Sequence, residues 1–376
     1  MQPIRILHVV VNMNRGGAET LIMNIYRQID RSRVQFDFLT CQQGIFDAEI
    51  ASMGAKIHRV PYVTEGGPVK YKKALEQFFR AHPEYAIVHS HMDKMSGFVL
   101  QAAKRCGVPL RIAHSHNTRS EGNVLSKSLK WFAGKMLLQT ATHYFACSKE
   151  ASKWLFKHQS KNVRLLKNGI DSQLFKPSME YRAKIRSEWH IAEDSLVVGH
   201  IGRFYHQKNH RFLIDIFSEM IRIHPNSFLV LVGDGPLRKK MEDKANSKLL
   251  SNRVIFLGVK ENVHEIMQAF DIMVFPSLHE GFPMTLIEAQ SASVPCVISD
   301  RITNEIDMGA GLIRYESLKM PPLSWAIQAL CFDQMKKGSA ADIKKKGYDI
   351  EQTAKWMENF YLSETQNLNA DRRKIG

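Results

Sequence analysis

The chain has 376 residues, with 52 Lys and Arg against 37 Asp and Glu and a formal net charge of +15. Its composition is that of a soluble globular protein with room for two domains, and no apolar run reaches the roughly 18 to 20 residues that span a bilayer. Five scattered cysteines without a CxxC pair argue against a disulfide or zinc framework and favour a reducing, cytoplasmic setting.

The basic excess lies in the first half of the chain. Residues 1–170 hold 25 Lys and Arg against 11 Asp and Glu, whereas residues 171–376 hold 27 against 26. Such an asymmetry indicates an anionic partner, which could be a membrane lipid, a phosphorylated substrate or a nucleic acid. A generally basic protein is the alternative.

Short apolar runs alternate with helix-length amphipathic stretches in the first half. The opening run lacks the length and the cleavage site of a secretory signal, so it is predicted to be the first strand. The expected strands are Ile4–Val10, Val34–Leu39, Ile57–Val60, Ala86–His89, Leu110–Ala113, His143–Ala146 and Val163–Leu166. Helices are expected between most of them, for example at Ala18–Ile29, Lys70–Arg80 and Met95–Cys106.

A glycine pair follows the first strand. Gly16 and Gly17 would let the backbone approach a ligand closely, and Ala18 opens a helix whose N-terminus favours anions. Ordinary punctuation between a strand and a helix explains the pair equally well.

Two histidine pairs fall at the ends of later strands. His89 and His91, like His114 and His116, are two residues apart and therefore share a face of their strand. Four such imidazoles could bind a metal, but no carboxylate or cysteine is placed to complete a site, so we expect no metal. A structural role remains open for at least one member of each pair.

Aromatic residues and lysines are mixed between residues 122 and 158. Trp131, Phe132, Trp154 and Phe156 stand among lysines on predicted helices, a pattern typical of helices that lie on a membrane surface. Each lysine near an anionic leaflet contributes about 1 kcal/mol. Core packing would explain the aromatic residues equally well.

A turn signal and a proline in Leu165–Pro177 mark a junction, after which the plan repeats. The second series of strands is Leu196–Ile201, Phe228–Val232, Val254–Leu257, Ile272–Phe275 and Cys296–Ile298. Its helices are expected at about His210–Ile223, Leu237–Ser247, Val263–Phe270 and Met284–Ala292, and one long helix at Ile350–Leu368 ends the pattern. Two such series predict an α/β protein with two doubly wound parallel sheets.

Ligands of doubly wound folds bind at the carboxyl ends of the strands, so the loops there are informative. After Leu196–Ile201, Gly202 clears space beside Arg203 and Lys208, whose two cations suit a diphosphate. Solvated surface charges are the alternative. The next loop has Gly233 and Gly235 in an incomplete nucleotide-loop pattern, and no P-loop sequence occurs in the chain.

The stretch "LHEGFPMTLIEAQ" places two glutamates around a turn. Gly281, Phe282 and Pro283 lead into a helix whose first free amides, at Met284 and Thr285, can hold a phosphate.

Because like charges repel, Glu280 should face neutral hydroxyls rather than that phosphate, and Glu288 could accept hydrogen bonds from a ribose diol. Hydroxyls on both sides of a diphosphate describe a nucleotide-sugar.

The motifs GGAE, KNGID, GRF…K, VGDGP and E-x7-E, in this order, resemble the GT-B glycosyltransferases of family 4. The stretches RIAHSHNTR and PLSW are similar to transferases of bacterial exopolysaccharide and capsule synthesis. The resemblance implies an acceptor-binding domain at 1–170 and a donor-binding domain at 171–349, facing each other across a cleft. It also implies a helix at 350–376 that crosses back to the first domain.

The resemblance also implies roles at the site, with retention of configuration and neither metal nor cofactor. Arg203 and Lys208 would hold the donor diphosphate, Glu280 would meet the sugar, and His114 or His116 would lie beside the transferred sugar. The expected donor-binding set is Gly16, Gly17, Gly202, Gly233, Gly235, Gly281, Phe282, Pro283, Met284, Thr285 and Glu288, with a UDP-sugar as the first candidate donor.

The resulting hypothesis is a cytoplasmic transferase, peripheral at the inner face of the membrane. It would move a hexose or N-acetylhexosamine to a polyprenyl-diphosphate-linked glycan. A nucleotide-sugar epimerase on the same fold and a non-catalytic basic protein that binds nucleic acid or a nucleotide-sugar are alternatives. A nucleic-acid partner is not expected, because no recognition motif for one occurs.

Two departures from the family pattern stand out. The stretch SDRITNEID lacks the usual glycines, which puts donor-sugar contacts near Asp300–Glu305 in doubt, and Ser293 replaces a glycine.

Overall fold

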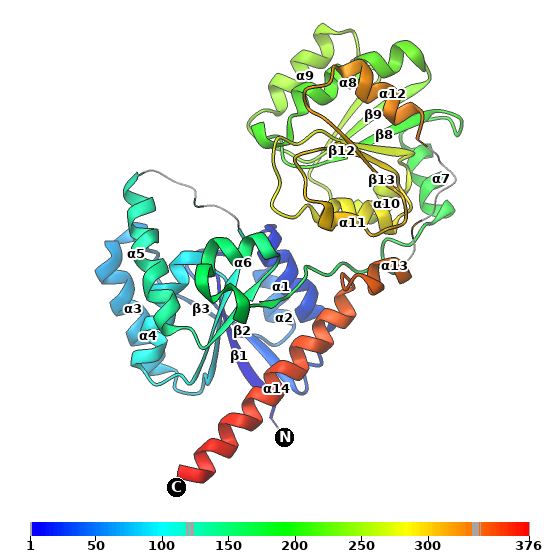
Figure 1. Ribbon diagram of the computed structural model, residues 1–376. Helices are drawn as coiled ribbons and strands as arrows, with labels where there is room; N and C mark the ends of the chain where they lie inside the picture. Colours follow the sequence, from blue (N-terminus) through cyan, green and yellow to red (C-terminus); the bar gives the residue numbers. More distant parts are fainter. Residues whose placement is uncertain (1, 118–119, 121–123, 333–337, 339, 376) are drawn as a thin grey trace. The chain divides into compact units, whose positions relative to one another are not determined.

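The computed structural model describes residues 2–117, 120, 124–332, 338 and 340–375. The chain divides into two compact units, Met1–Gly169 with Ile350–Gly376, and Ile170–Asp349 (Figure 1). Each unit is built around its own parallel sheet, as the alternating strand and helix pattern predicts.

The first unit, which we call unit 1, has a seven-stranded parallel sheet of order β3-β2-β1-β4-β5-β6-β7. Its strands are β1 (Ile4–Val9), β2 (Val34–Thr40), β3 (Ile57–Arg59), β4 (Ile87–Ser90), β5 (Leu110–Ser115), β6 (His143–Ala146) and β7 (Arg164–Leu165). Its α-helices are α1 (Gly17–Gln28), α2 (Asp47–Ser52), α3 (Gly67–Ala81), α4 (Ser96–Arg105), α5 (Val124–Thr140), α6 (Lys149–Phe156) and α14 (Ile350–Ile375).

Unit 1 buries both faces of its sheet. One face packs against α3, α4, α5 and α6 through residues such as Leu75, Phe98 and Leu137. The other face packs against α1 and α14 through residues such as Tyr26 and Tyr361. Helices on both faces explain why the strands are apolar runs rather than alternating ones.

The second unit, unit 2, has a six-stranded parallel sheet of order β10-β9-β8-β11-β12-β13. Its strands are β8 (Leu196–Ile201), β9 (Ser227–Val232), β10 (Val254–Gly258), β11 (Ile272–Phe275), β12 (Cys296–Ser299) and β13 (Ile313–Glu316). Its α-helices are α7 (Met179–Glu188), α8 (His210–Ile223), α9 (Arg238–Ser247), α10 (Val263–Gln268), α11 (Met284–Ser291), α12 (Pro322–Leu330) and α13 (Ala340–Lys345).

Both sheets reverse their strand order once, between β1 and β4 in unit 1 and between β8 and β11 in unit 2. At such a point the loops after the two neighbouring strands diverge to opposite faces of the sheet and leave a crevice for a ligand. We therefore expect ligand-binding sites at two pairs of loops, those after β1 and β4 and those after β8 and β11.

The helix α5 presents two aromatic residues to solvent. Trp131 is 54% exposed and Phe132 is 53% exposed, whereas Phe156 on α6 is fully buried in the core of unit 1. Core packing therefore accounts for Phe156 but not for the two residues of α5. Among the described residues, no helix is long and apolar enough to cross a membrane.

Ser293 occupies a left-handed position directly after α11. Its φ is +59°, and its amide and that of Val294 donate to Gln290 and Ala289 in the helix end, at 3.1 and 2.8 Å. A glycine is normally favoured at this position because a Cβ strains a left-handed backbone. The backbone conformation thus explains why the family pattern has glycine here.

We expect Ser293→Gly to stabilise unit 2 by about 0.5 to 1 kcal/mol, because the gain in backbone energy exceeds the loss of the Ser293 Oγ hydrogen bond to Gly338. Urea denaturation measures this change. Ser293→Ala is the control, because it loses the hydroxyl without relieving the strain and should destabilise. A glycine variant less stable than the wild type would contradict the expectation.

Candidate active site

The loops after β8 and β11 are joined at the carboxyl edge of the unit 2 sheet. The Leu278 amide donates to the Gln207 carbonyl at 2.8 Å, and Asn209 Nδ2 donates to the Pro276 carbonyl at 3.2 Å. These bonds bring the GRF…K motif of one loop beside the E-x7-E motif of the other, although the two lie about seventy residues apart in the sequence.

Lys208 and Glu280 form an ion pair across these loops. Lys208 Nζ lies 2.9 Å from Glu280 Oε1, and the Glu280 side chain is only 7% exposed. The two groups are close but poorly aligned for a hydrogen bond. Gln207 Nε2 donates to the other carboxylate oxygen at 3.1 Å. The ion pair was not predicted from the sequence. Because of it, Lys208 can bind a diphosphate only while it stays paired with Glu280 or after that ion pair breaks.

Arg203 is the more accessible cation of the pair predicted from the sequence. Its side chain is exposed, and its guanidinium lies 5.2 Å from the centre of the Tyr205 ring. Among the described residues, no carboxylate forms an ion pair with it. Arg203 is therefore placed to meet an anionic ligand without first breaking an ion pair.

The glycines of these loops have packing roles. A Cβ on Gly233 would lie 2.2 Å from the Gly202 carbonyl oxygen, and one on Gly235 would lie 2.8 Å from the Phe204 oxygen. A Cβ on Gly202 would lie 3.1 Å from the Lys208 side chain. Gly233 and Gly235 thus let the loop after β9 approach the loop after β8, and Gly202 makes room for Lys208.

The turn before α11 leads into the helix as the sequence predicts. Pro283 caps the helix, and α11 begins at Met284. The amides of Met284 and Thr285 have no acceptor within the helix because they belong to its first turn. Phe282 stacks on Tyr348 with 5.2 Å between ring centres, and Gly281 is exposed.

Glu288 lies on α11, one turn beyond those amides. Burial raises the pKa of its carboxyl from the ordinary 4.5 to about 7, although the side chain keeps some contact with solvent. A carboxyl that titrates near neutrality is sensitive to any ligand that donates hydrogen bonds to it.

A cavity of about 680 Å³ between α8 and α9 is lined by Tyr205 and His206 but by none of the donor-binding residues predicted from the sequence.

In unit 1, the predicted glycine pair stands at the start of α1. Gly16 caps the helix, and a Cβ there would lie 2.2 Å from a Glu19 carboxylate oxygen, whereas a Cβ on Gly17 would meet open space. Because the Glu19 side chain is flexible and can move aside, local packing requires glycine at neither position.

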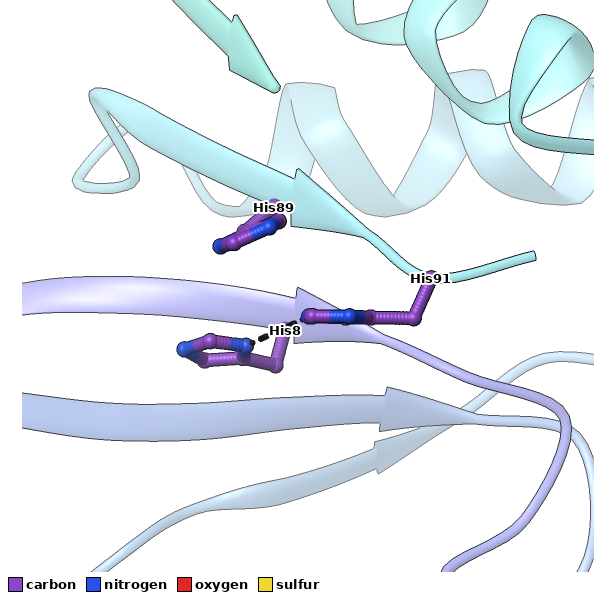
Figure 2. A group of neighbouring side chains, drawn as sticks. All are labelled: His8, His89 and His91. Carbon is purple, nitrogen blue, oxygen red and sulfur yellow. Dashed lines mark hydrogen bonds between the residues drawn. The ribbon is translucent and has the colours of Figure 1, made fainter. Parts of the chain in front are cut away.

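The histidines of unit 1 gather at the carboxyl edge of its sheet. Besides the two pairs predicted from the sequence, His8 on β1 joins them, and Figure 2 shows His8, His89 and His91 side by side. The sequence signal that was missed is a single histidine inside the apolar strand "IRILHV". His114 is fully buried and neither of its ring nitrogens has a partner among the described residues, whereas His116 is half-buried.

A cavity of about 210 Å³ lies beside this cluster. Its lining includes His91, Asp93, Lys94, Asn117, Lys130 and Trp154. Asp93, which the sequence did not single out, accepts hydrogen bonds from the His116 amide at 2.9 Å and from Asn117 Nδ2 at 2.5 Å. Its φ of +47° is left-handed, and burial raises the pKa of its carboxyl.

Two protein-family models match the chain. The model described as Glycosyltransferase Family 4 matches residues 15–174, and the model described as Glycosyl transferases group 1 matches residues 181–308.

Curated relatives match nearly the whole chain. It is 37% identical to the putative glycosyltransferase EpsF of Bacillus subtilis (strain 168), over 96% of this chain and 97% of that protein. It is 26% identical to the capsular polysaccharide biosynthesis glycosyltransferase CapH of Staphylococcus aureus, over 96% and 99%. It is also 26% identical to the UDP-Gal:alpha-D-GlcNAc-diphosphoundecaprenol alpha-1,3-galactosyltransferase of Escherichia coli, over 79% of each chain.

Solved structures share the architecture. The Anabaena protein HepE, crystallised in complex with UDP, is similar with a TM-score of 0.74 at 20% identity, over 96% of this chain and 99% of that one. At that identity the likeness shows the fold, which is GT-B.

Proposed function

The chain belongs to the glycosyltransferases of family 4 and group 1 and acts in polysaccharide biosynthesis, and from that premise we propose its finer activity. It transfers a hexose or N-acetylhexosamine, with retention, from a nucleotide-diphosphate-sugar to a lipid-linked glycan. UDP is the first base to test, because HepE was crystallised with UDP and the Escherichia coli relative is named for UDP-Gal.

The observation that carries the donor side is the joining of the two loops at the β8/β11 switch point. They place Lys208 beside Glu280 and belong to the same crevice as the first turn of α11. Two cations and a helix N-terminus supply the positive charge that a diphosphate needs, so the transfer is proposed to proceed without a bound metal.

The reaction is a displacement on one face of the sugar. The bond from the anomeric carbon to the diphosphate oxygen breaks, and the acceptor hydroxyl oxygen bonds to that carbon from the same side. The hydroxyl proton passes to the departing phosphate oxygen. Charge grows on the diphosphate in the transition state, which is where Arg203, Lys208 and the amides of Met284 and Thr285 act.

Glu280 and Glu288 serve neighbouring hydroxyls. Glu280 keeps one oxygen on Lys208, so it both holds that lysine in the crevice and presents a carboxylate toward the sugar. Glu288 accepts hydrogen bonds from the ribose diol. Of His114 and His116, we propose His116 as the one that meets a ligand, because it is half-buried whereas His114 is wholly enclosed.

The acceptor side of the proposal is a phosphate-bearing lipid. The cavity beside the histidines has Lys94 in its lining, and the pKa of Lys94 is lowered by burial and by the charges of Lys157 and Lys130. A diphosphate would relieve that crowding of like charges. The Escherichia coli relative is named for a diphosphoundecaprenol-linked acceptor, which is the chemistry this cavity suits.

We propose that the protein docks on the inner face of the membrane through α5. Lys127, Trp131 and Lys135 are four residues apart and so share one side of the helix, with Phe132 next to them. Lys135 Nζ lies 3.9 Å from the centre of the Trp131 ring. Exposed aromatic rings flanked by lysines suit the boundary between headgroups and acyl chains.

We expect the double variant Trp131→Ala, Phe132→Ala to bind vesicles of anionic lipid about tenfold more weakly than the wild type, because it loses two rings that insert into the interface. Vesicle co-sedimentation measures the effect. Leu249→Ala is the control, since Leu249 is 88% exposed in unit 2. Equal binding by the double variant and the wild type would exclude α5 as the docking surface.

The donor assignment is tested by calorimetric titration with UDP-, GDP-, ADP- and CMP-sugars. We expect selective binding of one base by the wild type and loss of that binding in Glu288→Ala. Failure to bind any nucleotide-sugar would leave only the fold in common with active relatives. Binding followed by conversion of the sugar into its epimer without an acceptor would favour the epimerase alternative.

A further inference from the structure

The cavity of about 680 Å³ in unit 2 has no role in the proposed transfer. It lies between α8 and α9, which pack side by side against the same face of the sheet (Figure 1). Its walls are the loop after β8, the start of α8 and one side of α9. Small-molecule sites have volumes of about 300 to 1,000 Å³, so this cavity can hold a ligand of the size of a nucleotide.

One side of α9 presents a row of lysines to this cavity. Lys240, Lys244 and Lys248 are four residues apart, so they lie on the same side of the helix, about 6 Å apart along its axis. The row therefore extends over about 12 Å. Ammonium groups spaced in this way match a chain of linked phosphates better than they match a single phosphate.

A carboxylate of α8 fixes two of these lysines. Lys244 Nζ lies 2.5 Å from Asp215 Oδ2, and Lys248 Nζ lies 3.2 Å from Asp215 Oδ1. Because one carboxylate serves two ammonium groups, the three residues together keep a surplus positive charge. The Lys244 side chain is only 17% exposed, so its position is set before a ligand binds and less side-chain freedom is lost on binding.

Arg211 of α8 and Lys240 of α9 add two further cations. Both side chains are exposed, and neither forms an ion pair with a carboxylate among the described residues. Asp243 also lines the cavity, but its Oδ1 lies 2.9 Å from Lys239 Nζ. The four cations of the lining therefore outnumber the nearby carboxylates, Asp215 and Asp243, by two. This excess favours an anionic ligand.

The start of α9 gives the cavity an apolar end. Leu237 and Met241 line it there, whereas the two lysines paired with Asp215 line it at the end of the helix. Tyr205, which is 48% exposed, adds an aromatic ring from the loop after β8. An exposed ring beside apolar side chains suits the flat base of a nucleotide.

We propose that the cavity between α8 and α9 binds an oligophosphate chain through Arg211, Lys240 and the two lysines paired with Asp215. A nucleoside triphosphate and inorganic polyphosphate both supply such a chain, and only the nucleotide would use the apolar end. The donor-binding residues predicted from the sequence do not line this cavity. The proposal therefore does not rest on the proposed function.

Calorimetric titration of the full chain with sodium tripolyphosphate and, separately, with ATP tests the site. We expect Arg211→Gln and Lys240→Gln each to bind tripolyphosphate about tenfold more weakly than the wild type, because each loses one charge-assisted contact. Both variants should fold normally, since the replaced side chains are exposed and form no internal ion pair. Arg222→Gln is the matched control, because Arg222 is an exposed arginine at the far end of α8.

Arg203→Ala separates this site from the proposed donor site. Tyr205 lines the cavity, and its ring centre lies 5.2 Å from the Arg203 guanidinium, so the two sites share a loop. We expect Arg203→Ala to bind tripolyphosphate as the wild type does. Loss of binding in Arg203→Ala, with unchanged binding in Arg211→Gln and Lys240→Gln, would place the phosphates on the donor loop and overturn the proposal.

Two other results would also overturn it. One is no binding of either probe. The other is equal weakening in Arg222→Gln and Arg211→Gln, which would indicate general attraction to a basic protein. The comparison of the two probes identifies the source of the phosphates. An affinity for ATP above that for tripolyphosphate supports a nucleotide ligand, and an equal or lower affinity supports inorganic polyphosphate.

Discussion

Replacing Arg203 with Ala is expected to lower kcat/KM for glycosyl transfer by about 100- to 1000-fold, the usual cost of removing one charged donor from a developing oxyanion. Arg203 has no internal carboxylate partner among the described residues and lies in the loop after β8, where the diphosphate is proposed to bind. Stability should not change, because the side chain is exposed. The measurement is the initial rate of sugar transfer at several donor concentrations.

One variant separates charge from geometry at this position, and one control lies elsewhere. Arg203→Lys keeps the charge but loses the planar pair of donors, so it should recover only part of the rate. Arg222→Ala removes an exposed arginine from the far end of α8 and should leave the rate unchanged. Wild-type turnover in Arg203→Ala would exclude Arg203 from the diphosphate site.

Donor affinity is expected to weaken about tenfold when the pH falls from 8 to 6, because Glu288 becomes protonated over that range. Its pKa is about 7 in the free protein, and hydrogen bonds from a ribose diol stabilise the charged carboxylate. Binding therefore favours the deprotonated form and releases a proton near neutrality. Calorimetry with the nucleotide-sugar at pH 6, 7 and 8 measures the change.

Glu288→Gln is the matched variant for this prediction. It should bind the donor with a nearly constant affinity between pH 6 and 8. A carboxyl with a raised pKa destabilises the folded state where it must be charged, so wild-type stability is lost as the pH rises from 4.5 through 7. Glu288→Gln should remove that loss and be more stable than the wild type at pH 8, by about 1 to 2 kcal/mol given the partial exposure. An equal pH dependence of donor binding in the wild type and in Glu288→Gln would assign that dependence to a titrating group other than Glu288.

The two parallel sheets were predictable because apolar strands and amphipathic helices alternate through the chain, and the prediction of two doubly wound sheets is confirmed. The strand β13 was missed because "IRYE" is short and only partly buried, so it lacks the apolar run that marks a central strand. The strand β7 keeps only two paired residues of a longer predicted strand.

The loops of the candidate site were predictable from where they lie, because doubly wound sheets place ligand loops at the carboxyl ends of their strands. The partners within those loops were not. The pairing of Lys208 with Glu280 depends on the backbone bonds between Gln207 and Leu278, and the close approach of Gly233 to Gly202 depends on loop curvature. Neither leaves a periodic signal in the sequence.

The histidine cluster of unit 1 was likewise only partly predictable from the sequence. The shared face of His89 with His91 follows from the two-residue period of a strand. The inclusion of His8 follows only from the register, in which His8 pairs with His89 across β1 and β4. Strand order and register must be known before three separate stretches of sequence become one cluster of histidines.

The most direct test is transfer of a labelled sugar from the donor that calorimetry selects to a polyprenyl-diphosphate-linked glycan in anionic vesicles, with the anomeric configuration of the product read by NMR. We expect a product with the configuration of the donor, formed only when the acceptor is present and insensitive to a metal chelator. An inverted product, or sugar released at the same rate without acceptor, would contradict retaining transfer to a lipid-linked glycan.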